Sequence, residues 1–198
     1  MQILEIEKFD IKGSILDIGS KKSLSNVSNY IKNNQNITYL DKYSDEFDDL
    51  KIDLEEKYNN QKNSKFENVI IFNVLEHIFN FQNCMDTCNF FLKKDGLILG
   101  STPFLFQIHG SPNDYFRYSE EALLIILKKG GFKEIKIKVL AGGIFVCFYS
   151  SFSRITQKIP FLNNFLFLFC QLFDFIFSLF SKNLKVIFPL GYFFSGKK

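Results

Sequence analysis

Polar side chains that could bind a small ligand stand at the ends of short apolar runs in the first half of the chain. Asp17 and Gly19 close one such run, Asp41 follows a second, and Asn73 ends a third. A glycine lets the chain turn sharply and lets a ligand approach bare backbone. Ligands of open α/β sheets bind outside the carboxyl ends of the strands. The pattern therefore predicts a ligand site assembled from several strand ends.

The spacing between two of these residues indicates the kind of ligand. Asp41 lies 22 residues after Gly19. In dinucleotide-binding folds, an acid about 20 residues beyond the glycine turn binds the hydroxyls of a ribose. A carboxylate that accepts two hydrogen bonds suits a vicinal diol, so we expect a ribose-containing ligand at Asp41.

A second group of candidate residues, His109, Asp114 and Arg117, stands in the long segment Phe104–Tyr118. A histidine can take a proton from a hydroxyl near neutral pH, which contributes roughly 10²–10⁴-fold to a rate. Asp114 could orient His109 or act as a base itself, and Arg117 could clamp a phosphate or carboxylate. Alternatively, Asp114 and Arg117 pair with each other and brace the segment.

Composition argues against several classes of site. The chain has 24 basic and 21 acidic residues, a net charge of +3 that is too balanced for a nucleic-acid-binding protein. The two histidines and four cysteines form neither a Cys-x-x-Cys pair nor a tight cluster, so we expect no metal site. Free thiols fit a reducing cytoplasm. The first ten residues carry three acids and no long apolar run, so we expect no signal peptide.

Apolar runs that alternate with helical patterns must position these residues, and this alternation predicts a doubly wound α/β domain. Strands are expected at 15–18, 37–40, near 50–52, and at 66–73, 97–102, 134–140 and 185–195, with helices at 22–34, 81–92 and 120–129. We expect a single domain over 1–198. It divides into a ligand-binding core at 1–141, an apolar helical insertion at 142–184, and a final strand and tail at 185–198.

The Phe-rich insertion has three interpretations. The 20 residues 161–180 are long enough to cross a membrane, although a strand that returns to the sheet after them argues against a span. A helix with one polar stripe could instead lie in the plane of a membrane or pack in a homodimer. The residues on this stripe are Asn164, Gln171, Asp174 and Ser178.

The order of elements and the residues at the strand ends resemble class I S-adenosylmethionine-dependent methyltransferases. Residues 15–20 resemble the first motif of that family, a strand that ends in Asp/Glu-x-Gly, and residues 73–77 (Asn-Val-Leu-Glu-His) resemble its motif after the fourth strand. Within the latter, we expect Glu76 and His77 to fix the turn rather than to do chemistry. The resemblance covers residues 14 to about 140 and implies a Rossmann-like, seven-stranded methyltransferase fold with the Phe-rich insertion before the last strand.

The resemblance also implies S-adenosylmethionine as the cofactor and a set of contacts to it. Gly19 and Ser20 would contact its methionine end through the backbone, while Asp17 orders that turn or holds the amino group. The resemblance further implies that Asp41 binds the ribose and that Asp53 and Leu54 flank the adenine. Asn73 would lie under the reacting sulfonium.

A narrower resemblance indicates the acceptor. Residues 101–103 (Ser-Thr-Pro) and 109–118 (His-Gly-Ser-Pro-Asn-Asp-Tyr-Phe-Arg-Tyr) are similar to a loop of bacterial methyltransferases of surface-polysaccharide and glycan biosynthesis. This similarity implies methyl transfer to a hydroxyl of a sugar or lipid-linked glycan precursor. It also implies a cytoplasmic protein, located at the inner face of the membrane if the insertion binds lipid.

Two alternatives stay open. The usual turn reads Asp-x-Gly-x-Gly-x-Gly, but here Lys21 and Ser23 replace its second and third glycines. A catalytically retired methyltransferase fold that binds a partner or membrane through its Phe-rich tail is therefore one alternative. The other is an oxidoreductase with a nucleotide cofactor, which would need a Gly-x-Gly-x-x-Gly turn that the sequence lacks.

Overall fold

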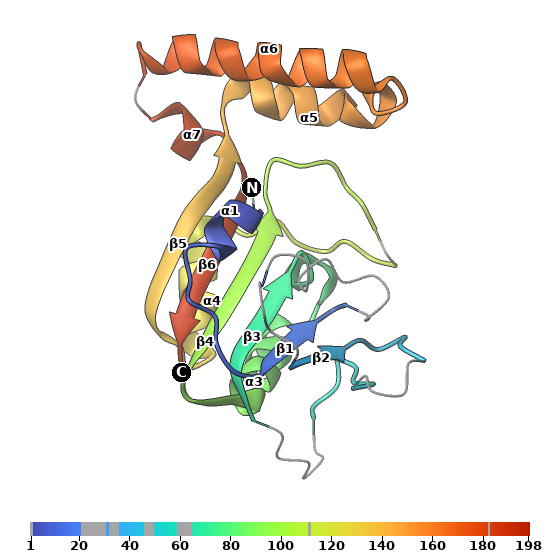
Figure 1. Ribbon diagram of the computed structural model, residues 1–198, viewed down its shortest axis with the longest axis vertical. Helices are drawn as coiled ribbons and strands as arrows, with labels where there is room; N and C mark the ends of the chain where they lie inside the picture. Colours follow the sequence, from blue (N-terminus) through green and yellow to red (C-terminus); the bar gives the residue numbers. More distant parts are fainter. Residues whose placement is uncertain are drawn as a thin grey trace.

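The computed structural model describes residues 2–20, 31, 36–45, 50–58, 65–110, 112–181 and 183–198. In this part of the chain six strands form one sheet in the order β2-β1-β3-β4-β6-β5 (Figure 1). Strands β1 to β4 are mutually parallel, and β6 runs antiparallel to both of its neighbours. The strands are β1 (Ile15–Ile18), β2 (Ile37–Leu40), β3 (Phe66–Phe72), β4 (Leu92–Pro103), β5 (Lys133–Gly142) and β6 (Pro189–Lys197).

The order in which the chain adds strands to the sheet reverses between β1 and β3. The chain passes from β1 to β2 on one side, and β3 and β4 then add on the other. Ile18 pairs with Leu40 of β2 and with Ile71 of β3, so the carboxyl ends of all three strands meet at one place. This arrangement is the topological switch point at which open α/β sheets bind ligands.

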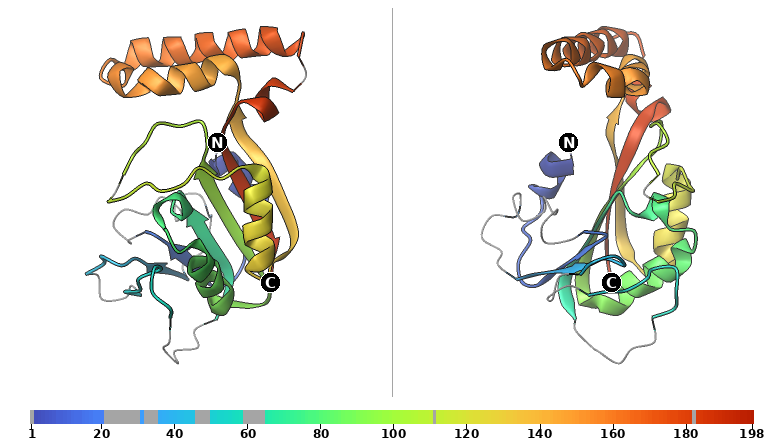
Figure 2. Two further views of the ribbon diagram at one scale, coloured as in Figure 1. Left: turned by 180° about the vertical axis from the view of Figure 1, so that it is seen from behind. Right: turned by 90° about the vertical axis from the view of Figure 1, so that its right-hand side faces the viewer.

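Elements on both faces bury the central strands, as their continuous apolar runs predicted. Helices α3 (Phe81–Phe91) and α4 (Glu120–Lys129) cover one face, and α1 (Gln2–Ile6) lies on the other (Figure 2). In β1, Leu16 packs into the core under α3 and α4, whereas Ile15 packs into the core on the α1 side. The helices predicted at 81–92 and 120–129 are therefore confirmed. The predicted helix at 22–34 lies outside the described residues except for Ile31.

The predicted strand near 50–52 is wrong. Leu50 forms only a single parallel bridge with Leu40 on the free edge of β2, so the described residues contain six strands rather than seven. Leu50 donates its N–H to the carbonyl of Tyr39 at 2.8 Å and accepts from Asp41 at 3.1 Å. Leu50, Ile52 and Leu54 still pack against the core, but in the described residues the segment makes no further ladder with β2 beyond this one bridge.

The last strand begins later than predicted. Residues Leu184–Ile187 form the short helix α7, and β6 starts at Pro189. A proline has no N–H to donate, and the first residue of a strand tolerates that loss. The pairing register of β6 with β5 shifts where Ala141 meets Gly191. Strand β6 is not an edge strand, since it lies between β4 and β5.

The Phe-rich insertion is a helical hairpin before the last strand, which confirms that part of the predicted fold. Helices α5 (Ile144–Thr156) and α6 (Pro160–Ser178) lie side by side beyond one end of the sheet (Figures 1 and 2). Strand β5 runs in the same direction as β4, so the hairpin stands at the end where the parallel strands have their carboxyl termini. The hairpin and the predicted ligand site therefore share one end of the molecule.

Asp174 explains how α6 tolerates a carboxylate in its apolar sequence. Its side chain is buried and accepts hydrogen bonds from the backbone N–H groups of Phe145 (3.0 Å) and Val146 (2.8 Å). These N–H groups belong to the first turn of α5 and have no partner within that helix. Asp174 thus turns its charge toward α5 instead of toward the solvent-facing side of α6.

Candidate active site

A cavity of about 590 Å³ opens at the carboxyl ends of β1, β2 and β3. Its volume falls in the range of about 300–1,000 Å³ that is usual for small-molecule sites. Asp17 is buried within β1, and neither it nor Ser20 is part of the lining. The other five residues predicted to bind a cofactor line this cavity together: Gly19, Asp41, Asp53, Leu54 and Asn73.

Gly19 has a conformation that only glycine adopts easily. Its φ is +74°, and a Cβ atom built at this position would lie 2.3 Å from Cγ2 of Val74. Its N–H donates to the carbonyl of Leu40 at 2.7 Å, which ties the turn to the end of β2. The first glycine of the predicted motif is therefore needed for the backbone, independently of any ligand.

Two carboxylates stand on the β2 side of the cavity. Oδ1 of Asp41 accepts a hydrogen bond from the N–H of Tyr43 at 2.7 Å, which fixes the side chain at the cavity wall. Asp53 forms an ion pair with Lys42 at 2.5 Å and accepts from the N–H of Glu55 at 3.0 Å. Asp41 is thus better placed to receive ribose hydroxyls than Asp53 is to receive an adenine amine.

Asn73 marks the junction between this cavity and a second one. Its φ of +53° turns the chain directly after β3, and its Oδ1 accepts hydrogen bonds from Gln2 (3.0 Å) and Ser101 (3.2 Å). The second cavity, of about 230 Å³, is lined by Asn73, Thr102 and His109, among others. One amide side chain therefore borders both the predicted cofactor side and the predicted acceptor side.

Asp114 and Arg117 form a forked ion pair. Nη2 of Arg117 donates to Oδ2 of Asp114 at 2.6 Å, and Nη1 donates to Oδ1. Nη2 also donates to the carbonyl of Gln107 at 3.3 Å. Hydrogen bonds from Arg117 hold the pKa of Asp114 well below its usual range. The geometry favours the bracing role over the predicted anion clamp and the predicted second base, because both groups are already bound within the loop.

The bracing pair holds His109 in place. Oδ2 of Asp114 accepts a hydrogen bond from the backbone N–H of His109 at 2.9 Å and lies 3.4 Å from Nδ1 of its ring. The loop is also attached to the turn after β3, where the carbonyl of Glu76 accepts from the N–H of Tyr115 at 2.8 Å. His109 keeps 27% of its side chain exposed, so it can meet a substrate.

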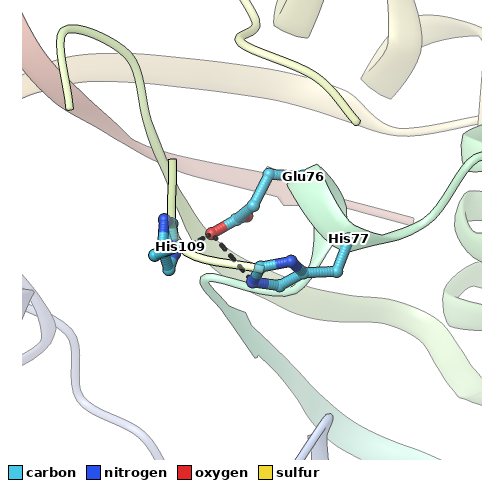
Figure 3. Close-up of side chains that lie close together, drawn as sticks. All are labelled: Glu76, His77 and His109. Atoms are coloured by element: carbon cyan, nitrogen blue, oxygen red, sulfur yellow. Dashed lines mark ion pairs between the residues drawn. The ribbon is translucent and has the colours of Figure 1, made fainter. Parts of the chain in front are cut away.

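Glu76 is a functional candidate that the sequence reasoning assigned only to fixing a turn. It lies with His77 in a 3₁₀ turn (Leu75–His77), and its side chain points between two imidazole rings (Figure 3). Its Oε1 lies 3.7 Å from Nε2 of His77 and 3.6 Å from Nε2 of His109. The signal that could have found this cluster is the adjacency of β3 and β4, which brings the segments after them together.

The electrostatic state of Glu76 is unusual for a carboxylate. Its side chain is fully buried, and neither carboxylate oxygen has a hydrogen-bond partner among the described residues. Burial raises the pKa of Glu76 to about 7, against the opposing effect of the Arg117 charge. A buried carboxylate without partners costs free energy and is common at functional sites.

Comparisons with known proteins identify the fold. No protein-family model matches the chain, and no curated protein sequence matches it. The whole chain superposes on phosphoethanolamine N-methyltransferase 2 of Haemonchus contortus, solved with phosphomonomethylethanolamine and S-adenosylhomocysteine, with a TM-score of 0.60 and 16% identity. It spans about half of that enzyme, 52% of the longer chain.

Two shorter proteins resemble the chain over nearly their full length. For a SAM-dependent methyltransferase of Archaeoglobus fulgidus the TM-score is 0.58 at 15% identity, with 99% of this chain and 92% of the other covered. For an S-adenosylmethionine-dependent methyltransferase of Mesorhizobium loti it is 0.59 at 10% identity, with coverage of 100% and 98%. These likenesses confirm the predicted Rossmann-like methyltransferase fold.

Proposed function

We propose that this protein transfers a methyl group from S-adenosylmethionine to a hydroxyl of a small acceptor. The observation that carries the proposal is the convergence of Gly19, Asp41 and Asn73, from the ends of three adjacent strands, on one cavity of a methyltransferase fold.

The residues present fit this cofactor. The bare backbone at Gly19 and the carboxylate of Asp41 would meet its polar parts, the latter at the ribose diol. Ile52, Leu54 and Ile78 supply apolar wall for a purine ring. When bound, the cofactor supplies a methyl group on a positively charged sulfur.

The chain's own part in the reaction is alignment and proton transfer. Holding the reactants in line contributes a large share of such a rate enhancement. As the acceptor oxygen forms its bond to the methyl carbon and the carbon–sulfur bond breaks, the hydroxyl proton passes to Nε2 of His109. Asp114 and Gln107 hold that imidazole through its Nδ1 side. The products are the methyl ether and S-adenosylhomocysteine.

We further propose that the hairpin of α5 and α6 lies in the surface of a membrane and that the acceptor is a sugar of a lipid-linked glycan precursor. Helix α6 has 19 mostly apolar residues, and only 11% of its most apolar 18-residue stretch is buried. It is the one helix among the described residues that is long and apolar enough to cross a membrane. Its most exposed large side chains include Phe161 (85%), Phe165 (57%) and Phe175 (63%).

Polar contacts inside the hairpin support lipid contact on its outside. Oδ1 of Asn163 accepts hydrogen bonds from Tyr149 (2.5 Å) and Thr156 (2.8 Å), and Asp174 caps α5. These polar groups face the partner helix, although Gln171 and Asn164 of the predicted polar stripe stay exposed. The hairpin also contacts the loop after β4, since Arg154 donates to the carbonyl of Ile108 at 3.2 Å. A membrane-bound hairpin would therefore place the second cavity near the lipid headgroups, at the cytoplasmic face.

Methyl transfer is tested with cofactor labelled in its methyl group. The labelled cofactor is incubated with the protein and either a membrane lipid extract or soluble sugar nucleotides. We expect label in the lipid fraction, and transfer that is slower by roughly 10²-fold or more with His109→Ala. Folded protein that transfers no label and binds no cofactor would support the retired-methyltransferase alternative instead.

Membrane binding is tested by flotation with liposomes. We expect the chain to float with them and a Phe165→Ser/Phe175→Ser variant to stay behind. Ile125→Ser, which changes an exposed apolar residue on α4, is the matched control and should float. A wild-type protein that does not float but sediments as a dimer, which the double substitution dissociates, would contradict membrane contact and identify a second copy as the partner.

A further inference from the structure

We propose that Glu76, His77 and His109 form a binding site for a divalent transition-metal ion such as Zn²⁺. Each residue offers one ligand atom, and the three atoms lie within 4.8 Å of one another. The Nε2 atoms of both histidines face the same carboxylate oxygen, Oε1 of Glu76, as Figure 3 shows. These are the only two histidines in the chain.

The other nitrogen of each ring already has an acceptor. Nδ1 of His77 contacts the carbonyl of Asn113, and Nδ1 of His109 lies 3.3 Å from the carbonyl of Gln107 and 3.4 Å from Oδ2 of Asp114. An imidazole that donates from Nδ1 keeps the lone pair on Nε2. Histidine ligands of metals are held in this way by a carbonyl or carboxylate behind the ring.

The state of Glu76 is an independent observation that calls for a cation. Its carboxylate is fully buried, aims into the cluster, and has no hydrogen-bond partner among the described residues. A buried polar group that no donor satisfies is rare and costly. A metal ion between Oε1 and the two Nε2 atoms would satisfy it.

The donor set and spacing indicate the class of ion. Two imidazoles and a carboxylate suit Zn²⁺ and neighbouring first-row ions, whereas Mg²⁺ and Ca²⁺ prefer oxygen ligands. Bonds of about 2.0–2.1 Å in tetrahedral geometry place ligand atoms about 3.3 Å apart. The separations from Oε1 of Glu76 to the two Nε2 atoms, 3.7 and 3.6 Å, are near this value, and all three atoms lie within 4.8 Å of one another, so a bound ion would draw the two imidazoles together.

A metal ion at this site would also take part in the proposed methyl transfer, and this catalytic role rests on the proposed function. Three protein ligands leave a coordination position open. His109 lines the second cavity and His77 lines the first, so an ion held by both would stand where the two cavities approach each other. A metal ion there would bind the acceptor hydroxyl and lower its pKa, which favours attack on the methyl group. In the metal-bound protein Nε2 of His109 would be a ligand instead of the base, and the hydroxyl proton would pass to solvent water.

The expectation of no metal site rested on spacing along the chain and on cysteine and histidine alone. The fold brings His77 and His109 together from the segments after two neighbouring strands, and a carboxylate supplies the third ligand.

The experiment is calorimetric titration of the full chain, first stripped with EDTA, with ZnCl₂ and with CoCl₂ in the absence of S-adenosylmethionine. We expect one ion per chain, bound at micromolar concentration or tighter. Both histidine ring signals in the NMR spectrum should shift on addition of Zn²⁺. Because no methyl donor is present, this result stands or falls separately from methyl transfer.

Variants locate the ion. We expect Glu76→Gln and His109→Ala each to weaken binding by at least about tenfold, and Glu7→Gln, at an exposed acid, to leave it unchanged. If Glu76→Gln fails to fold, His109→Ala still provides the test, because the His109 side chain is partly exposed and its loss should not prevent folding. Binding only at millimolar concentration, binding that both variants retain, or a cobalt–thiolate absorption band would overturn the proposal.

Discussion

Oε1 of Glu76 lies 3.6 Å from Nε2 of His109, and this contact joins the turn after β3 to the loop after β4. The backbone of Glu76 supports the same junction, because its carbonyl accepts from the N–H groups of Tyr115 (2.8 Å) and Phe116 (3.3 Å). One residue therefore positions the loop through its backbone and faces the loop's histidine through its side chain. His109 is held where the two cavities approach each other.

Replacing Asp41 should weaken the binding of S-adenosylmethionine. We expect Asp41→Ala to raise the dissociation constant by about 10- to 100-fold, since a hydrogen bond to a charged group contributes about 1.5–3 kcal/mol. Asp45→Ala is a matched control, because Asp45 is 93% exposed in the same segment. Calorimetry should show weaker cofactor binding for Asp41→Ala and wild-type binding for Asp45→Ala. If the two variants bind the cofactor with equal affinity, Asp41 does not bind the ribose.

Replacing Gly19 should destabilise the whole domain. A non-glycine residue at φ +74° costs about 1–2 kcal/mol, and the added methyl group would clash with Cγ2 of Val74 at 2.3 Å. We expect Gly19→Ala to lower the free energy of unfolding in urea by about 2 kcal/mol or more. Adding Val74→Ala should relieve the clash but not the backbone strain. A Gly19→Ala protein as stable as the wild type would contradict this geometry.

Removing the His109 ring should separate catalysis from cofactor binding. We expect His109→Ala to bind S-adenosylhomocysteine with unchanged affinity while its turnover falls roughly 10²-fold or more. The cofactor cavity is lined by other residues, whereas His109 borders the second cavity. Turnover at the wild-type rate would refute the role of His109.

The stability contributed by Glu67 should depend on pH. Hydrogen bonds from Lys93 and Ser14 lower the pKa of Glu67 from 4.5 to about 2. A carboxylate with a lowered pKa stabilises the fold above its unfolded pKa, and this contribution is lost as the pH falls toward its folded pKa. Glu67 is 41% exposed, so solvent screening limits the effect to about 0.5–1 kcal/mol.

Urea unfolding of Glu67→Gln tests this dependence. We expect the variant to be less stable than the wild type at pH 7, and the difference to shrink between pH 4.5 and pH 2. Lys93→Met should produce a similar loss, and the double variant less than the sum. A difference that stays constant over this pH range would show that the charge of Glu67 contributes nothing.

Continuous apolar runs made the central strands predictable. Residues 15–18 and 66–72 are buried almost throughout, and such runs have few alternatives to a covered parallel strand. The edge of the sheet was harder, because Leu50, Ile52 and Leu54 alternate like a strand and pack on the core, yet only Leu50 bridges to β2. The start of β6 was misplaced because Val186 and Ile187, which are exposed on α7, read like strand residues.

The residues of the site that directly follow strands could be predicted, but the buried carboxylate in the turn after β3 could not. Gly19, Asp41 and Asn73 each follow a recognisable strand, so parallel pairing alone brings them together. The burial of Glu76 could not be predicted, because a charged residue in a turn normally lies in solvent. It depends on the loop that follows β4, whose path is fixed by tertiary contacts such as the Asp114–Arg117 pair.

The central claim is that the cavity beside Gly19 and Asp41 binds the methyl donor, and calorimetry with S-adenosylmethionine and S-adenosylhomocysteine tests it most directly. We predict that both bind with one site per chain and that Asp41→Ala weakens both. A protein that is folded by circular dichroism and yet binds neither compound at millimolar concentration would contradict the account.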